Sequence, residues 1–332
     1  MKSKTTTLAN TLLSVIIFAL ISFTTTSCNK DNSVQPNQTE LNDTQYIQSV
    51  VAGGYNSGNS VEDNLMTQET SDFDDGGAVK DNDNGPDSNI DSLLRWGRKV
   101  ENVNINYNIT SSGDTMFTVN VTRTITGKYI IIGYVSGLVD SINKPYTEVF
   151  YRTVIFKRVD STQHPRLNWR VYQISNLDGG TTTPQIGSSQ VQITKIEVYG
   201  SLGLLYTFNG PDFQNQLYTT MRFGGQGIPA FARGEQLTYK VYTTSQLSPT
   251  DYVAFHWARN TYGFHRIPFT LESQTGTGPY YRVYTKSFTI YDNHKFGFFN
   301  AYLSASTHES LYDSDPNKFA SDEVSFPYKI FQ

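Results

Sequence analysis

The chain has 332 residues, with 26 Lys and Arg against 30 Asp and Glu, which gives a formal net charge of −4 at pH 7. That length is enough for one large domain or two ordinary ones. The mildly acidic balance and the lack of a basic cluster argue against nucleic acid as a partner, because nucleic-acid binding depends on clustered Lys and Arg. The 22 Tyr and 20 Phe residues favour β-strands, so the composition predicts a β-rich protein.

Residues 1–27 have the pattern of a signal peptide. Lys2 and Lys4 give the positive start, and an apolar run follows over residues 12–23. This run is about as long as a signal-peptide core and too short to span a bilayer comfortably. Small residues at 24–27 lead to Cys28, so we expect cleavage just before that cysteine.

Cys28 is the only cysteine in the chain and therefore cannot form an internal disulfide. The pair Ser27-Cys28 resembles the lipobox of bacterial lipoproteins. That resemblance implies that the thiol of Cys28 receives a diacylglyceride, whose acyl chains (palmitate, for example) hold the protein on a membrane. The alternative interpretation is a chance thiol at the end of the leader.

The residues after Cys28 predict where the anchored protein resides. Residues 29–32, Asn-Lys-Asp-Asn, resemble the sorting segment of some Gram-negative surface lipoproteins. This implies a lipid-anchored protein of the outer membrane, on its cell-surface or its periplasmic face. The whole of residues 28–42 has little to bury, which predicts a flexible tether.

Residues 43–97 carry apolar residues near helical spacing, so we expect three helices there. The first would begin with Asp43 or Thr44 as its N-cap, and the third with Asn89 or Asp91. Their apolar faces would consist in turn of Tyr46, Ile47, Val50 and Val51, then Val61, Leu65 and Met66, and finally Leu93, Leu94 and Trp96.

From residue 99 the apolar period changes to two, which predicts antiparallel strands. We expect four of them, over residues 100–109, 117–132, 149–158 and 169–175. A hairpin turn is predicted at 111–114 and a bulge at Gly127.

Helices followed by four long strands resemble the NTF2-like (cystatin-like) family over residues 43–177. The resemblance also rests on six residues, Arg152, Phe156, Trp169, Arg170, Ile174 and Ser175. It implies an α+β cone whose curved sheet and helices enclose a pocket, which some members use for catalysis and many for binding. No catalytic residue of the family can be carried over, and the one histidine of this segment, His164, lies in a predicted loop.

Residues 178–189 are rich in Gly, Thr, Ser and Pro, which predicts a linker between domains. Residues 190–332 then show eight or nine short alternating segments separated by turn residues, which predicts an all-β sandwich. In length and rhythm this part resembles Ig-like domains of bacterial surface proteins. A jelly roll, as in carbohydrate-binding modules, is the alternative topology.

Candidate groups for chemistry lie mostly in the second predicted domain. The histidines at 256, 265, 294 and 308 lack the close spacing of a zinc site, so no metal and no cofactor is expected. Two carboxylate pairs could serve as calcium or glycosidase sites, but we expect them to be surface acids. They are Asp313 with Asp315 and Asp322 with Glu323. Trp257, Tyr262 and His265 are the candidate ligand-contact residues, because aromatic rings there could form a binding platform.

The sequence therefore favours a non-catalytic cell-envelope lipoprotein that binds a partner protein or serves as a spacer module. Its expected partners are the membrane, through lipid on Cys28, and a protein or glycan ligand. Two alternatives stay open: a carbohydrate-binding surface lipoprotein, and an enzyme that uses the pocket of the NTF2-like domain.

Overall fold

A computed structural model describes residues 42–52, 65, 90–184, 190–220, 227–260 and 263–331. Leu41–Gln332 forms one compact unit, separate from Met1–Glu40. The described part is mostly antiparallel β-sheet. None of its helices combines the length and the apolar character needed to cross a membrane.

The first predicted helix is confirmed as α2 (Asp43–Val51). Its four apolar residues at helical spacing are all buried, as predicted. The N-cap, however, is Asn42, one residue before the predicted Asp43. Asn42 and Gln45 form a capping box, in which each side chain accepts a hydrogen bond from the backbone N–H of the other.

The predicted third helix is wrong, because Leu93, Leu94 and Trp96 belong to the long strand β1 (Ser92–Ser112). The register with the neighbouring strand shifts between Leu93 and Arg95, which makes a β-bulge. A bulge adds one residue to a strand, so Leu93 and Trp96, three positions apart, both become buried. That spacing imitates the period of a helix. Of the predicted second helix, only Leu65 lies within the described residues, and it is helical.

The four predicted strands are confirmed and three of them are longer than expected. They are β1, β2 (Met116–Val135), β3 (Leu138–Arg158) and β4 (Trp169–Ser175), with the short helix α4 (Pro165–Asn168) before β4. The predicted bulge at Gly127 lies on the partner strand instead, since Glu101 of β1 is the unpaired residue opposite Gly127. Gly127 is required because a Cβ there would collide with the backbone oxygen of Lys99.

The first half of the predicted linker is a strand, β5 (Leu177–Thr183). It pairs with β3 on one side and with β16 (Ser321–Phe331) on the other. One sheet therefore continues from the first predicted domain into the second. This sheet has eleven strands in the described residues, and its main path runs β1-β2-β3-β5-β16-β15-β11-β12. Its remaining strands are β8 (Leu217–Thr219), β9 (Ala230–Ala232), β11 (Tyr252–Asn260), β12 (Gly263–Pro268) and β15 (Gly297–Ser306).

A second, five-stranded sheet has the order β13-β14-β10-β6-β7. Its strands are β6 (Val191–Gly200), β7 (Gly203–Asn209), β10 (Gln236–Ser245), β13 (Thr270–Thr275) and β14 (Tyr280–Thr289). The described residues also include two short helices, η2 (Phe213–Asn215) and α5 (His308–Tyr312). The neighbouring strands β12 and β13, separated by Phe269 alone, belong to different sheets. The two facing antiparallel sheets are consistent with the predicted sandwich.

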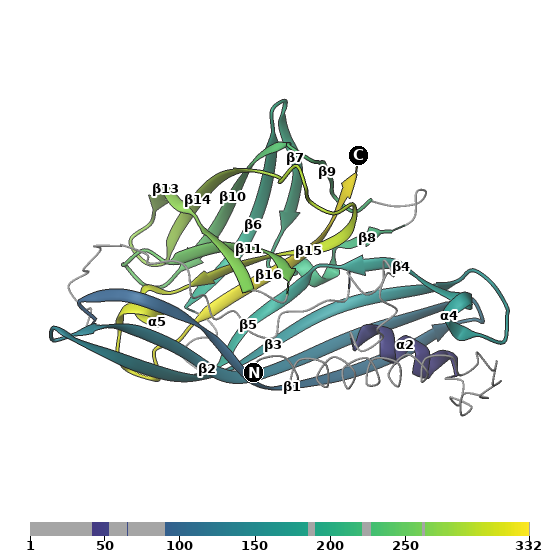
Figure 1. Cartoon of the computed structure of the whole chain (residues 1–332), viewed down its shortest axis with the longest axis horizontal. Helices are drawn as coiled ribbons and strands as arrows, with labels where there is room; N and C mark the ends of the chain where they lie inside the picture. Colours follow the sequence, from purple (N-terminus) through teal and green to yellow (C-terminus); the bar gives the residue numbers. More distant parts are fainter. Residues whose placement is uncertain are drawn as a thin grey trace, which may run out of the picture. The chain divides into compact units, whose positions relative to one another are not determined.

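Strands β15 and β16 run between the five-stranded sheet and the long strands β1–β3 (Figure 1). Because side chains alternate along a strand, each of these middle strands presents two buried faces. On β16, Val324 and Phe326 pack into the apolar core of the sandwich. Ser321 and Glu323 point the other way, where they contact Arg98 of β1.

Arg98 joins three strands through buried ion pairs. Its Nη2 lies 3.2 Å from Oε1 of Glu148 on β3, and it also contacts Oε1 of Glu323 on β16. Glu323 is fully buried, so the expectation that it is a surface acid is wrong. The hydroxyl groups of Tyr302 and Ser321 donate to the same carboxylate. The physical reason is alternation, which turns Glu323 away from the solvent and toward the interior beside β1.

We predict that Glu323→Gln lowers the free energy of unfolding by about 3 kcal/mol, because it removes one partner of a buried ion pair. Urea unfolding followed by circular dichroism would measure the loss. Glu101→Gln is the matched control, since Glu101 pairs with Lys128 at the surface, where both side chains are more than 40% exposed. It should cost less than about 1 kcal/mol. Equal losses in the two variants would contradict the structural role of Glu323.

Candidate functional site

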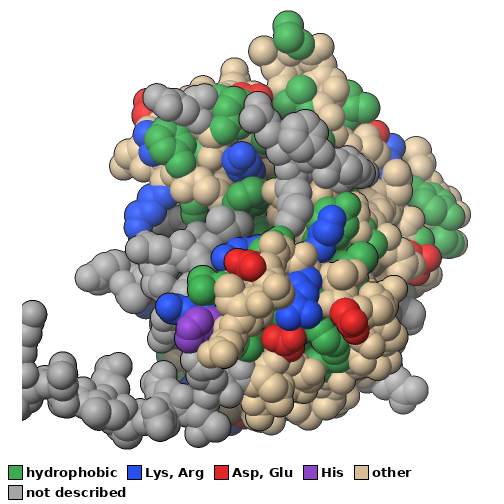
Figure 2. All heavy atoms as spheres, turned by 90° about the vertical axis from the view of Figure 1, so that its right-hand side faces the viewer, with side chains coloured by type: hydrophobic (Ala, Val, Ile, Leu, Met, Phe, Trp, Pro, Cys, Tyr) green, Lys and Arg blue, Asp and Glu red, His purple; other side chains and the backbone are tan. Residues whose placement is uncertain are grey.

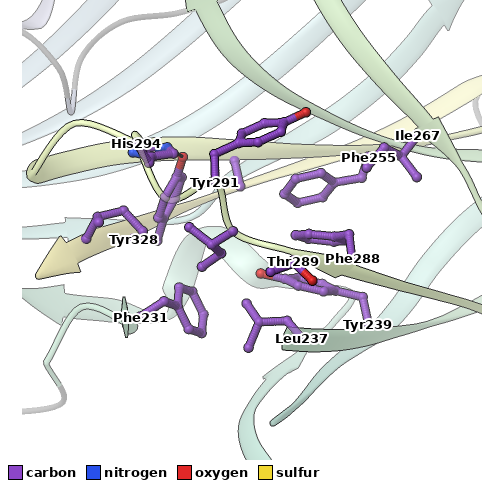
Figure 3. Close-up of a pocket in the computed structure, with 13 residues that line it drawn as sticks. Phe231, Leu237, Tyr239, Phe255, Ile267, Phe288, Thr289, Tyr291, His294 and Tyr328 are labelled. Carbon is purple, nitrogen blue, oxygen red and sulfur yellow. Dashed lines mark hydrogen bonds between the residues drawn. The ribbon is translucent and has the colours of Figure 1, made fainter. Parts of the chain in front are cut away.

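An apolar cleft opens between the two sheets at one end of the sandwich, with a cavity volume of about 80 Å³. A single buried water needs roughly 10–15 Å³, so the cleft has room for an apolar group. Strands of both sheets and the loop after β14 form its walls (Figure 3). The described lining residues are Phe231, Leu237, Tyr239, Phe255, Ile267, Phe288, Thr289, Ile290, Tyr291, His294, Ala301, Tyr328 and Ile330.

Three aromatic rings form one wall of the cleft. Tyr239 of β10 stacks on Phe288 of β14, with ring centroids 5.2 Å apart and planes 17° apart. Phe255 of β11 lies 5.3 Å from Tyr239 and 5.1 Å from Phe288, so it closes the group from the opposite sheet. Side chains alternate between the two faces of each strand, and all three rings occupy positions that face the interior of the sandwich.

His294 and Tyr328 supply polar atoms at the cleft. The Nδ1 atom of His294 lies 2.8 Å from the carbonyl oxygen of Lys295, which can only accept a hydrogen bond, so Nδ1 donates. In the neutral ring, Nε2 then accepts from the hydroxyl of Tyr328, 3.2 Å away. Burial raises the pKa of Tyr328 and of Tyr239, so both phenols stay neutral.

Exposed aromatic side chains surround the entrance. Tyr291, which lines the cleft, is 53% exposed, and Phe296 in the same loop is 49% exposed. The guanidinium of Arg233 lies 3.6 Å from the centre of the Phe296 ring, and its Nε donates to the carbonyl of His294. Arg233 therefore holds the loop against the end of the sandwich while both aromatic rings face the solvent.

The described lining of the cleft contains aromatic and aliphatic side chains, one threonine and one histidine, and no carboxylate or lysine. Such a lining offers contact area and a few hydrogen bonds to a bound group. It matches the usual composition of a binding pocket, which is mostly apolar with a small number of placed polar groups.

No family model, curated protein or solved structure matches this chain. Its function is therefore inferred from its own residues.

The structure places the predicted ligand-contact residues only in part. Cys28 and Tyr262 lie outside the described residues. Trp257 and His265 are opposite one another in the β11–β12 hairpin, two positions beyond the pair formed by Phe255 and Ile267 that lines the cleft. Their backbones are thus adjacent to the cleft.

Of the remaining candidates for chemistry, His308 and Asp313 line one hollow, together with Glu309. His256 is buried on β11, hydrogen-bonds Ser304 at 2.9 Å, and has a pKa well below its ordinary value because of burial and nearby arginines. Asp313 binds Lys318 at 3.5 Å. No group of three or more His, Cys, Asp or Glu side chains that could hold a metal occurs in the described part of the chain.

Charges of both signs lie near one another on the face shown in Figure 2, where Lys and Arg side chains are interspersed with Asp and Glu among uncharged residues. Among the described residues of this face, the charges do not form one large patch of a single sign. This face therefore resembles an ordinary solvated protein surface.

A second hollow, of about 270 Å³, contains the carboxyl groups of Asp178 on β5 and Asp322 on β16. Asp322 lies opposite Gly180 in the register, which makes it a diagonal neighbour of Asp178. Burial raises the pKa of Asp322 to about 8 and that of Asp178 to about 7. Asp322 accepts a 2.6 Å hydrogen bond from the backbone N–H of Ile193, so it also links β16 to β6 of the other sheet.

We predict that wild-type stability declines as the pH rises from about 4 to about 8, in part because of Asp322. Its folded pKa of about 8 exceeds the ordinary 3.8, so the folded state binds the extra proton throughout this range. The contribution of protonated Asp322 to the free energy of unfolding is fully present below about pH 4 and is lost above about pH 8. Asp322→Asn keeps an acceptor for Ile193 and should flatten this decline in urea unfolding between pH 5 and 8.

The control for this pH experiment is Asp114→Asn in the exposed turn after β1, which should retain the wild-type slope. A variant Asp322→Asn whose stability declines with pH as steeply as that of the wild type would contradict the assignment.

Proposed function

We propose that this protein is a non-catalytic lipoprotein of the cell envelope that binds a partner protein through the aromatic cleft of its sandwich. The lipid on Cys28 would hold it at the outer membrane, on the cell-surface or the periplasmic face. The leader, the small residues before Cys28 and the polar tether after it support the anchoring. The cleft supports the binding role, and it is the observation that carries this proposal.

The occupant that fits the cleft best is an aromatic or branched aliphatic side chain of the partner. A lining of aromatic and aliphatic groups gains free energy mainly from burying apolar surface. Aromatic anchors that enter a pocket commonly dominate protein–protein affinity, surrounded by contacts that exclude water. The exposed rings of Tyr291 and Phe296 at the entrance would supply such surrounding contacts.

A carbohydrate ligand is the second candidate. The observation in its favour is that Trp257 and His265 pair in the hairpin that forms one wall of the cleft. Against it, the described lining offers few hydrogen-bonding groups for sugar hydroxyls. Glycan-array binding that is lost in Trp257→Ala or Tyr262→Ala would favour this alternative.

The finer fold assignment belongs to the same proposal. We propose an NTF2-like arrangement for residues 43–177 and an Ig-like one for the sandwich of residues 190–332. In support, α2 buries Tyr46 and Ile47 in the cluster that contains Val154 and Trp169 of the long sheet. A purified fragment 43–177 that turned over a substrate would revive the enzyme alternative.

We predict that the wild-type protein, expressed in a Gram-negative host, incorporates an alkyne-tagged palmitate and that Cys28→Ala does not. The reason is that the thiol of Cys28 is the group to which a lipoprotein pathway would attach the diacylglyceride, whose acyl chains carry the label. Protease treatment of intact cells then reports the face: degradation places the protein on the cell surface, and protection until the outer membrane is opened places it inside. Equal labelling of both variants would contradict the anchor.

We further predict that a photo-crosslinking amino acid at Tyr291 yields one discrete protein adduct in intact envelopes. The matched control is Tyr281, which is 55% exposed but lies at the opposite end of β14, and it should yield no such adduct. Ala301→Leu, which enlarges a side chain that lines the cleft, should abolish the adduct while the circular dichroism spectrum stays unchanged. Identical adducts at both positions, or an adduct that survives Ala301→Leu, would exclude the cleft as the binding site.

A further inference from the structure

Two arginines occupy buried positions on one face of the long sheet, which also carries Glu148, the partner of Arg98. Arg123 on β2 is 5% exposed and Arg152 on β3 is 3% exposed. Arg123 lies opposite Phe150, so Arg152 is its diagonal neighbour on the same face. Along β2, Val121 belongs to one hydrophobic cluster and Ile125 to the other. The arginines therefore lie between two apolar interiors.

Neither arginine is paired with a carboxylate among the residues that the structure describes. Arg123 makes no hydrogen bond or ion pair to them, and its buried Nε atom has no partner. Arg152 donates only to neutral oxygens, at 3.2 Å to Leu65 O, 3.4 Å to Asn300 Oδ1 and 3.5 Å to Ser325 Oγ. These three bonds are longer than charge-assisted hydrogen bonds from guanidinium groups to anions, which measure about 2.7–2.9 Å.

Arg282 shows how this protein compensates a buried arginine elsewhere. It is 1% exposed, and its Nη1 donates to Oδ2 of Asp251 at 2.7 Å. Its other donors reach three further oxygens, all at 2.7 Å: Oε1 of Gln274 and the carbonyls of Leu247 and Ser248. The lack of a carboxylate partner is therefore particular to Arg123 and Arg152 and is not shared by every buried arginine of the described residues.

Both arginines remain cations at neutral pH. Burial lowers the pKa of Arg123 to about 10 and that of Arg152 to about 9, and the nearby charge of Arg123 contributes to the latter. Both values are well above 7. Two adjacent buried cations are costly for a folded protein unless an opposite charge compensates them.

We propose that Arg123 and Arg152 form a binding site for an oxyanion, a phosphate, sulfate or carboxylate group, inside the long sheet. The planar fork of a guanidinium matches the oxygens of such groups and binds them in bidentate fashion. On binding, Arg152 would exchange long hydrogen bonds to neutral oxygens for short bonds to an anion. Asn300 and Ser325, which already contact Arg152, would border the bound group.

This site does not depend on the proposed function of the cleft. Asn300 and Ser325 point to the β1–β3 side of the middle strands, whereas Ala301 points to the cleft on the other side. A substitution can therefore remove the arginine site and leave the cleft intact, or remove the cleft and leave the arginine site intact.

The test is the melting temperature of the purified full chain in phosphate, sulfate or acetate, each against chloride at equal ionic strength. We expect the wild type to gain roughly 5 °C at a saturating oxyanion concentration. Phosphate and sulfate also stabilise proteins in general, so the variants decide the outcome. Arg123→Met should lose the oxyanion-specific gain, and Arg170→Met, which removes a partly exposed arginine of β4, should keep it. A gain in phosphate and sulfate alone indicates a tetrahedral group, and a gain in acetate alone a carboxylate.

The melting temperature in chloride gives a second, independent readout. Removal of one of two uncompensated cations should leave the melting temperature of Arg123→Met unchanged or raise it. An equal gain in all three proteins, or no gain in any of them, would overturn the proposal. It would also fail if Arg123→Met and Arg123→Gln both lowered the melting temperature in chloride by more than about 10 °C, because the arginine would then be compensated within the fold.

Discussion

The buried ion pairs of Arg98 fix the position of strand β16, and the rest of the structure depends on that position. The guanidinium comes from β1, and its two carboxylates, Glu148 and Glu323, come from β3 and β16. Breaking such a pair leaves an uncompensated charge inside the protein, so the geometry tolerates little displacement. Because β16 also pairs with β5, β9 and β15, these ion pairs add to the backbone pairing that joins the long strands to the sandwich.

Strand β16 and its neighbour β15 separate two interiors of opposite chemistry. On one side aromatic and aliphatic side chains fill the sandwich and leave the cleft lined by Tyr239 and Phe255. On the other side the same strands present hydroxyls, an amide and a glutamate to two arginines, Arg98 and Arg152. Both candidate binding sites thus lie back to back across a single layer of sheet, and the period-two alternation of a strand makes this arrangement possible.

The sequence predicted the strands better than it predicted how they associate. Alternation is a local signal, so the four strands of the first predicted domain could be located from their own residues. Leu93 and Trp96 led to the wrong prediction of a helix because a β-bulge reproduces helical spacing. Strand β5 was predicted as a linker because it contains glycines, which here allow close contact between strands. The cleft combines strands distant in the chain, which no local pattern reveals. Arg123, by contrast, left a readable signal, since it interrupts the apolar buried positions of β2 between Val121 and Ile125.

The central place of β16 also determines when the protein can complete its fold. This strand follows every other described strand in the chain, yet it joins β5 to β15 in the middle of the larger sheet. Pairings between residues far apart in sequence form late and slowly. Until β16 is available, β5 has an open edge and the inner face of the sandwich is incomplete. The larger sheet therefore closes only when its last described strand pairs, which makes this pairing a late step of folding.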